Sequence, residues 1–148
     1  MAGKELYNGR CSCGKVSFET TAAPDWIGIC HCDTCRRATG GVLGGACGFP
    51  RDAVTINGKT HQHYQATAEV RRSFCSNCGS SISYQSSRWP TDIHIMIGVF
   101  DEPENLTPQF HLFIKDRLPW ICLADTLVQY NTTPGNSTAE RQETSHES

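Results

Sequence analysis

The stretch Cys30-His31-Cys32-Asp33-Thr34-Cys35 places three cysteines within six residues, and two further cysteine motifs lie on either side of it in the sequence. These are Cys11-Ser12-Cys13-Gly14 and Cys75-Ser76-Asn77-Cys78-Gly79. Two cysteines so close in sequence can turn both thiolates toward one ion, and structural zinc takes four such ligands in a tetrahedron. Nine cysteines in a chain of 148 residues, with no apolar leader among its first residues, favour metal binding over disulfides.

The spacing of the motifs predicts how the cysteines divide between metal ions. Cys75 and Cys78 supply half of a tetrahedral site, and Gly79 follows where such a turn commonly needs a positive φ. The other half has to come from the first motif or from the central one. The simplest partition is a closed structural zinc site plus a second zinc site with one position open to water or substrate. The closed site would use Cys11, Cys13, Cys75 and Cys78, and the open site Cys30, Cys32 and Cys35.

Two other interpretations of the same cysteines stay open. In the first, one four-cysteine zinc site is the whole metal content, and the central motif holds only reduced thiols. In the second, a C-x-x-C pair cycles between dithiol and disulfide, although the sequence lacks the βαβ pattern that such motifs favour. Cys47 and Cys122 lie in apolar segments outside the motifs, and we expect both to be small core residues.

The segments between the motifs have the alternating or short apolar patterns of strands, so the expected fold class is all-β. Strand candidates cover residues 16–19, 26–30, 54–56, 71–74, 80–84, 93–100 and 110–114. A short helix or turn after Cys32 is the most helix that the pattern supports. From residue 131 onward the sequence has no large apolar side chain to bury. We therefore expect one zinc domain over residues 1–130 and a disordered tail over residues 131–148.

Composition excludes several classes of function. The net charge of −2 offers no general basic surface for nucleic acid or anionic lipid. No run of about 18 apolar residues is long enough to span a membrane. We expect a cytoplasmic protein whose partner is a small thiol or thiol adduct, with neither nucleic acid nor membrane as a partner. Assembly into a homo-oligomer stays open.

The three motifs, in this order, resemble those of the glutathione-dependent formaldehyde-activating enzyme family, which also includes centromere protein V. The similar segments are residues 9–16, 30–37 and 74–80, and Phe110-His111-Leu112-Phe113 with Pro119-Trp120 and Asp125 is similar to the family's closing segment. The resemblance covers about residues 6 to 130. It implies a β-tent fold around the closed zinc, two Zn²⁺ ions per chain and glutathione as co-substrate at the open zinc.

The activity that the resemblance implies is the addition of glutathione to formaldehyde, which gives S-hydroxymethylglutathione. The function expected for this chain is therefore that of a zinc-dependent carbon–sulfur lyase acting on glutathione or a glutathione adduct. Cys30, Cys32 and Cys35 would serve catalysis as ligands of the open zinc. A different class of function is a non-catalytic zinc-binding interaction module or a glutathione carrier.

Charged and aromatic residues near the motifs supply candidate substrate contacts. Arg36 and Arg37 follow the central motif directly, and a guanidinium can clamp a carboxylate of glutathione in a bidentate pair. His31 stands between two expected ligands, so its ring is expected to pack behind the metal rather than to ligate it. His61 and His63 are expected on an exposed strand edge, and His94 is expected to face away from the core.

Overall fold

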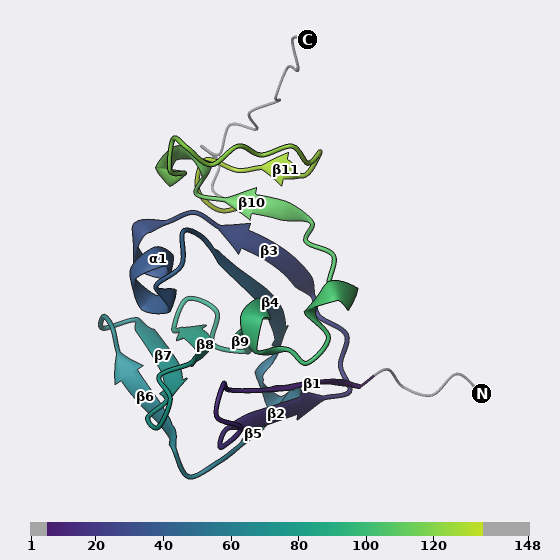
Figure 1. The fold of residues 1–148 in the computed structure, drawn as a ribbon, viewed down its shortest axis with the longest axis vertical. Coiled ribbons are helices and arrows are strands. Elements are labelled where there is room, and N and C mark those ends of the chain that lie inside the picture. Colours follow the sequence, from purple (N-terminus) through teal and green to yellow (C-terminus); the bar gives the residue numbers. More distant parts are fainter. Residues whose placement is uncertain (1–5, 135–148) are drawn as a thin grey trace, which may run out of the picture. The chain divides into compact units, whose positions relative to one another are not determined.

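The computed structural model describes residues 6–134, and the chain divides into two compact units. The first unit contains residues 6–26 and 46–107, and the second contains residues 27–45 and 108–134. Figure 1 shows the elements of both units along the chain. Of the predicted tail, only residues 131–134 are described, and the remainder lies outside the described residues.

A three-stranded antiparallel sheet of the first unit carries the first cysteine motif between two of its strands. Its order is β1-β2-β5, with β1 at Tyr7–Arg10, β2 at Ser17–Thr20 and β5 at Val54–Asn57. The apolar alternation that predicts strands here is confirmed, because Phe18 is buried and faces Gly9 and Ile56 in the register. Gly9 has no room for a side chain, since a Cβ there would lie 2.0 Å from the Val99 carbonyl oxygen.

A second antiparallel ladder of the first unit carries the third cysteine motif at the turn between two strands. Its order is β4-β9-β8-β7-β6. The strands are β4 (Gly44–Pro50, in this unit from Ala46 onward), β6 (His61–Gln65), β7 (Val70–Cys75), β8 (Ser81–Ser86) and β9 (Asp92–Met96). Short 3-10 turns follow at Arg51–Ala53, Ile97–Val99 and Pro103–Asn105.

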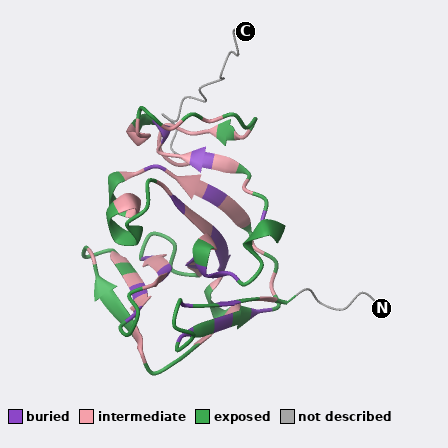
Figure 2. Cartoon of the chain, viewed as in Figure 1, coloured by how far each residue is buried: buried purple, intermediate pink, exposed green. Residues whose placement is uncertain are grey.

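The core of the first unit is apolar and aromatic. Phe18 packs edge-on against Phe100 at 4.9 Å between ring centroids, and Phe49 stacks on Phe100 at 6.2 Å. Ile93 and Ile95 of β9 are buried on the same strand face. Figure 2 colours the chain by burial, with the buried residues in purple. Burying aromatic area of this kind is a major source of stability in a small unit.

The second unit is built around three parallel strands. Strand β10 (Phe110–Leu112) runs parallel to β3 (Trp26–Cys30, in this unit from Ile27 onward) and to β11 (Val128–Gln129). Helix α1 (Asp33–Thr39) follows β3, which confirms the expected short helix after Cys32. It ends at Gly40, whose φ of 73° and amide bond to the Arg36 carbonyl form a left-handed cap.

Two predicted strands are shorter in the structure than in the sequence pattern. The apolar run 93–100 leaves the strand after Met96, because the Phe100 amide turns back to the Ile97 carbonyl and Phe100 then bridges to Gly9. The run 110–114 ends at Leu112, because Phe113 takes a left-handed φ of 51° and a 3-10 turn follows at Ile114–Asp116. The all-β class is confirmed. No helix in residues 6–134 has the length and apolarity that crossing a membrane requires.

Candidate metal centres

Two tight turns in the first unit bring Cys11, Cys13, Cys75 and Cys78 together. In the turn after β1, the Gly14 amide bonds to the Cys11 carbonyl at 3.0 Å. In the turn after β7, the Gly79 amide bonds to the Cys75 carbonyl at 2.7 Å. Both glycines have a positive φ, 79° and 80°, as the pattern at Gly79 predicts. The two turns are joined by a hydrogen bond from the Ser12 amide to Ser80 Oγ at 3.0 Å.

The sulfur spacing of this cluster matches a tetrahedral zinc site. Its four Sγ atoms lie within 4.8 Å of one another. Cys13 Sγ lies 3.6 Å from Cys11 Sγ and 3.8 Å from Cys75 Sγ. Zn–S bonds of about 2.3 Å at tetrahedral angles place neighbouring sulfurs ~3.8 Å apart, whereas a disulfide needs about 2.05 Å. The donor set therefore suits a zinc ion and excludes a disulfide in this arrangement.

Hydrogen bonds to the sulfurs of this cluster help two of its cysteines to ionise to thiolates, the form that binds a metal. The Ser80 hydroxyl and backbone amides lower the pKa of Cys78 to about 5. The Thr60 hydroxyl, 3.3 Å from Cys75 Sγ, lowers the pKa of that thiol against the opposing effect of burial. Cys11 is buried, and burial raises its pKa although the Val16 amide donates to its sulfur at 3.2 Å. Such donors to a thiolate are the outer-shell contacts that tune metal sites.

The second unit brings the three cysteines of the central motif together. Cys30 ends β3, Cys32 caps helix α1 and Cys35 lies in the first turn of that helix. Their sulfurs lie within 4.8 Å of one another, and the group contains no ring nitrogen of His31. Cys32 Sγ accepts the Cys35 amide at 3.3 Å, so the sulfur takes the position that Ser or Asp usually fills at a helix N-cap.

The central cluster favours one thiolate over its neighbours. Hydrogen bonds from Cys30 and Cys35, with further donors at Thr34 and the Cys35 amide, hold the pKa of Cys32 well below its ordinary value. The same sharing with Cys32 raises the pKa of Cys30. Without a metal, Cys32 therefore ionises before Cys30.

Arg36 and Arg37 of α1 have different surroundings. Arg36 is mostly buried, and its Nη1 donates to the carbonyl oxygens of His31 and Asp116, the latter at 2.7 Å. Its guanidinium thus ties the turn after β3 to the 3-10 turn after β10. Arg37 is 79% exposed, and its Nε donates to both carboxylate oxygens of Asp33, at 3.0 and 3.1 Å. Only Arg37 of the two has a largely solvent-exposed guanidinium.

The expectation that His31 packs rather than ligates agrees with its geometry, but the sequence did not reveal its partner. His31 and His111 are both fully buried, and their rings share a hydrogen bond of 2.9 Å between His31 Nε2 and His111 Nδ1. His111 Nε2 in turn bonds Asp125 Oδ2 at 2.9 Å. The signal for this partner is the parallel pairing of β3 and β10, which no local sequence pattern contains.

The remaining candidates are placed as follows. Cys47 is fully buried in β4, and burial raises its pKa to about 12, as expected of a core thiol. Cys122 is exposed, which makes its predicted core position wrong. His61 and His63 pack ring to ring on β6. His94 lies among Trp26, Tyr84 and Trp89, so the face away from the apolar core is itself covered by aromatic rings.

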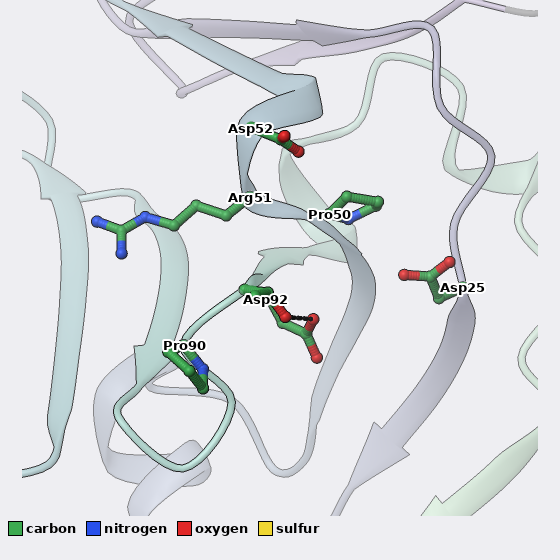
Figure 3. Close-up of a pocket in the computed structure, with 7 residues that line it drawn as sticks. Asp25, Pro50, Arg51, Asp52, Pro90 and Asp92 are labelled. Atoms are coloured by element: carbon green, nitrogen blue, oxygen red, sulfur yellow. Dashed lines mark hydrogen bonds between the residues drawn. The ribbon is translucent and has the colours of Figure 1, made fainter.

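A hollow of about 690 Å³ in the first unit contains none of these cysteines. Figure 3 shows that Asp25, Asp52, Asp92 and Arg51 supply its charged side chains. Thr91 Oγ1 donates to the Asp92 carboxylate at 3.3 Å. Three carboxylates and one guanidinium offer no soft ligand, so the hollow is not a thiolate site.

Known proteins are similar to this chain in sequence and in fold. A family profile described as "Glutathione-dependent formaldehyde-activating enzyme" matches residues 6–116. A Halomonas elongata protein named "Putative glutathione-dependent formaldehyde-activating enzyme" is 32% identical over 126 residues, which cover 78% of this chain and 80% of the relative. A Schizosaccharomyces pombe protein named "Uncharacterized lyase" is 23% identical over 111 residues, covering 75% and 80%. A crystal structure of a Rhodobacter sphaeroides protein has a similar fold, with a TM-score of 0.54 and 19% identity, covering 68% of this chain and 91% of that one.

Proposed function

Because the chain belongs to the glutathione-dependent formaldehyde-activating enzyme family, we propose that it is a zinc-dependent carbon–sulfur lyase that acts on glutathione or a glutathione adduct. The observation that carries the proposal is the cluster of Cys30, Cys32 and Cys35, whose sulfurs lie within 4.8 Å of one another. Three protein ligands leave the fourth position of a tetrahedral ion for a ligand from outside the chain. The names of the relatives, one a formaldehyde-activating enzyme and one a lyase, support the same reaction class.

The two clusters would hold zinc for different purposes. Cys11, Cys13, Cys75 and Cys78 fill all four positions and would form the structural site. Cys30, Cys32 and Cys35 would hold the second ion. Bound there, zinc supplies a cation that stabilises a substrate sulfur as thiolate at neutral pH.

The chain's own residues would select and orient the thiol. Arg37 is the better candidate for a carboxylate of glutathione, because its exposed guanidinium can exchange Asp33 for a substrate carboxylate. Arg36 holds the backbone around the cluster through the His31 and Asp116 carbonyls. The His31 ring is neutral at physiological pH, since burial and the nearby His111 lower its pKa. It therefore adds no positive charge beside the thiolates.

The proposed reaction balances without an oxidant or reductant. The glutathione sulfur attacks the carbonyl carbon of formaldehyde, a C–S bond forms and the C=O π pair moves to oxygen. The proton that the thiol loses ends on that oxygen, which gives S-hydroxymethylglutathione. In the reverse direction the C–S bond breaks, and the sulfur leaves as a thiolate that the same site stabilises.

Calorimetry of the zinc-loaded protein tests the proposal. Glutathione should bind with release of a proton, and S-methylglutathione, which cannot ionise at sulfur, should bind much more weakly. Formaldehyde consumption with glutathione, followed by NMR, then tests turnover. Cys32→Ser is the control, because serine preserves the helix cap while removing one sulfur ligand. Equal binding of the two ligands without proton release would overturn the thiolate site, and thiol binding without turnover would make the chain a glutathione carrier.

A further inference from the structure

A buried chain of three side chains leads away from the central cysteine motif. His31 lies in the turn after β3, His111 lies in β10 and Asp125 precedes β11. Both histidines are buried, whereas the Asp125 side chain is 38% exposed. Each link, from His31 Nε2 to His111 Nδ1 and from His111 Nε2 to Asp125 Oδ2, is 2.9 Å long. The second Asp125 oxygen accepts the Leu127 amide at 3.0 Å, which fixes the carboxylate in place.

When both imidazoles are uncharged, the chemistry of the three groups fixes where the hydrogens lie. An ionised carboxylate only accepts hydrogen bonds, so His111 Nε2 has to carry a hydrogen. In a neutral His111 ring, Nδ1 is then an acceptor, and His31 Nε2 has to carry a hydrogen as well. The remaining nitrogen, His31 Nδ1, is left with a lone pair. The ionised form of Asp125 is favoured, because the His111 and Leu127 hydrogen bonds lower its pKa against the opposing effect of burial, the largest single influence.

His31 Nδ1 is buried and has no hydrogen-bond partner among the described residues. Nearly every buried polar atom in a folded protein has a partner, so an unpaired one calls for a role. The sulfur cluster of the central motif does not include this nitrogen, although the ring stands between two of its cysteines in the sequence. The lone pair is thus a hydrogen-bond acceptor for which residues 6–134 supply no donor, in the turn that carries Cys30 and Cys32.

We propose that Asp125 and His111 are positioning residues that hold His31 as its Nε2–H tautomer, so that Nδ1 accepts a hydrogen bond from a ligand at the central cluster. The ligand class is a small donor, either the hydroxyl of a thiol–aldehyde adduct or a water molecule in its place. This function of Nδ1 rests on the proposed glutathione chemistry, whereas the tautomer itself does not. The positioning of His31 depends on which ring nitrogen of each histidine carries the hydrogen, and neither ring has to gain a proton.

Nitrogen-15 NMR of the zinc-loaded full chain tests the tautomer directly. In the wild type, His31 should show a hydrogen-bearing Nε2 and a bare Nδ1, and His111 should show the same pattern. Asp125→Asn presents an amide that can donate to His111 Nε2, which moves the hydrogen of His111 to Nδ1 and reverses His31. Asp116→Asn is the matched control, since it removes one carboxylate from the same unit and should leave both rings unchanged.

A wild-type His31 with hydrogen on Nδ1 would overturn the proposal without any variant, so a failure of Asp125→Asn to fold leaves the test intact. Rings that stay unchanged in a folded Asp125→Asn would overturn it too. With the reversed tautomer, the adduct hydroxyl can no longer donate to Nδ1 and has to turn to accept from Nδ1–H, so binding of the hydroxymethyl adduct should weaken by up to about 12-fold, the upper end for one hydrogen bond. Asp125→Glu, which restores a carboxylate, should recover part of that loss. If the affinity of these variants for the adduct follows their thermal stability instead of the His31 tautomer, the role of Asp125 is only structural and the proposal is wrong. Loss of glutathione binding in the wild type, with the tautomer as expected, would refute the proposed function alone.

Discussion

Replacing Cys75 by serine should destabilise the chain far more than the same change at Cys32. Both changes remove one sulfur from a proposed zinc site. Cys75 belongs to the four-cysteine cluster, in which a contact between Cys13 and Cys75 spans 62 residues of sequence. Cys32 belongs to the central cluster, whose members lie within six residues of one another. The two sites therefore constrain the unfolded chain to very different extents.

The size of the difference follows from the length of chain that each site closes. A cross-link over 62 residues removes enough unfolded-state entropy to stabilise the folded state by about 4 kcal/mol at 25 °C. The same relation gives about 2 kcal/mol for a loop of roughly five residues. A native domain is stable by only about 5–15 kcal/mol, and zinc binding itself adds to the loss at the closed site. We expect Cys75→Ser to be largely unfolded and Cys32→Ser to stay folded with about one zinc.

Cys47→Ser is the control for placing a hydroxyl where a buried sulfur was. Cys47 and Cys75 are both fully buried strand residues of the first unit, but Cys47 belongs to neither cluster. Its change should cost about 1–3 kcal/mol, the range for burying an unpaired hydroxyl. The measurements are zinc content by elemental analysis and the free energy of unfolding in urea, monitored by circular dichroism. Equal losses of stability at Cys75 and Cys47, or a single zinc in the folded wild type, would refute the division into a structural and an exchangeable site.

Two further predictions concern stability at other positions. His94 is mostly buried, and burial lowers its pKa to about 4, so the unfolded chain takes up a proton below pH ~6.5 while the folded chain does not. The free energy of unfolding in urea should therefore fall by about 2 kcal/mol between pH 7 and pH 5. His94→Phe should remove that part of the fall. Arg36→Ala should lower the free energy of unfolding by about 3 kcal/mol, because the Arg36 guanidinium donates to two carbonyls. Arg37→Ala should lower it by less than about 1 kcal/mol and should weaken glutathione binding in calorimetry. A larger loss of stability for Arg37→Ala than for Arg36→Ala would contradict the separate roles assigned to the two arginines.

Several strands and both cysteine clusters were predictable because their signals are local, whereas β1 and β4 lie outside the predicted strand segments. Alternation within four residues identifies β2, and a glycine directly after Cys78 identifies a turn with positive φ. The ends of β9 and β10 were not predictable from apolarity. Ile97 and Val99 continue the apolar run, but the chain turns there so that Phe100 can bridge to Gly9. Tertiary packing overrides the local pattern at that point.

The surroundings of the central cluster depend on pairing between distant segments, which no spacing rule contains. His111 faces Ile29 in the parallel register, and this pairing brings its ring to His31 across 80 residues of sequence. The distinction between the two arginines has the same origin. Arg36 reaches the Asp116 carbonyl because the turn after β10 lies beside α1, whereas Arg37, one residue further along the helix, pairs with Asp33 four residues before it. Adjacent residues of one type thus differ in role for reasons that only the fold supplies.

The charges around the central cluster favour a soft anionic ligand over the activation of water. Zinc held by three thiolates would carry a formal charge of −1, which weakens its pull on the oxygen of a bound water. A sulfur ligand still binds well to such an ion, because zinc is borderline-soft and the neighbouring ligands are sulfurs. Arg36 and Arg117 are close enough to act on the His31 ring, where their positive charges favour the neutral imidazole. A neutral His31 ring therefore leaves the softness of the sulfur ligands, and not an added positive charge, to favour a thiol at the proposed site.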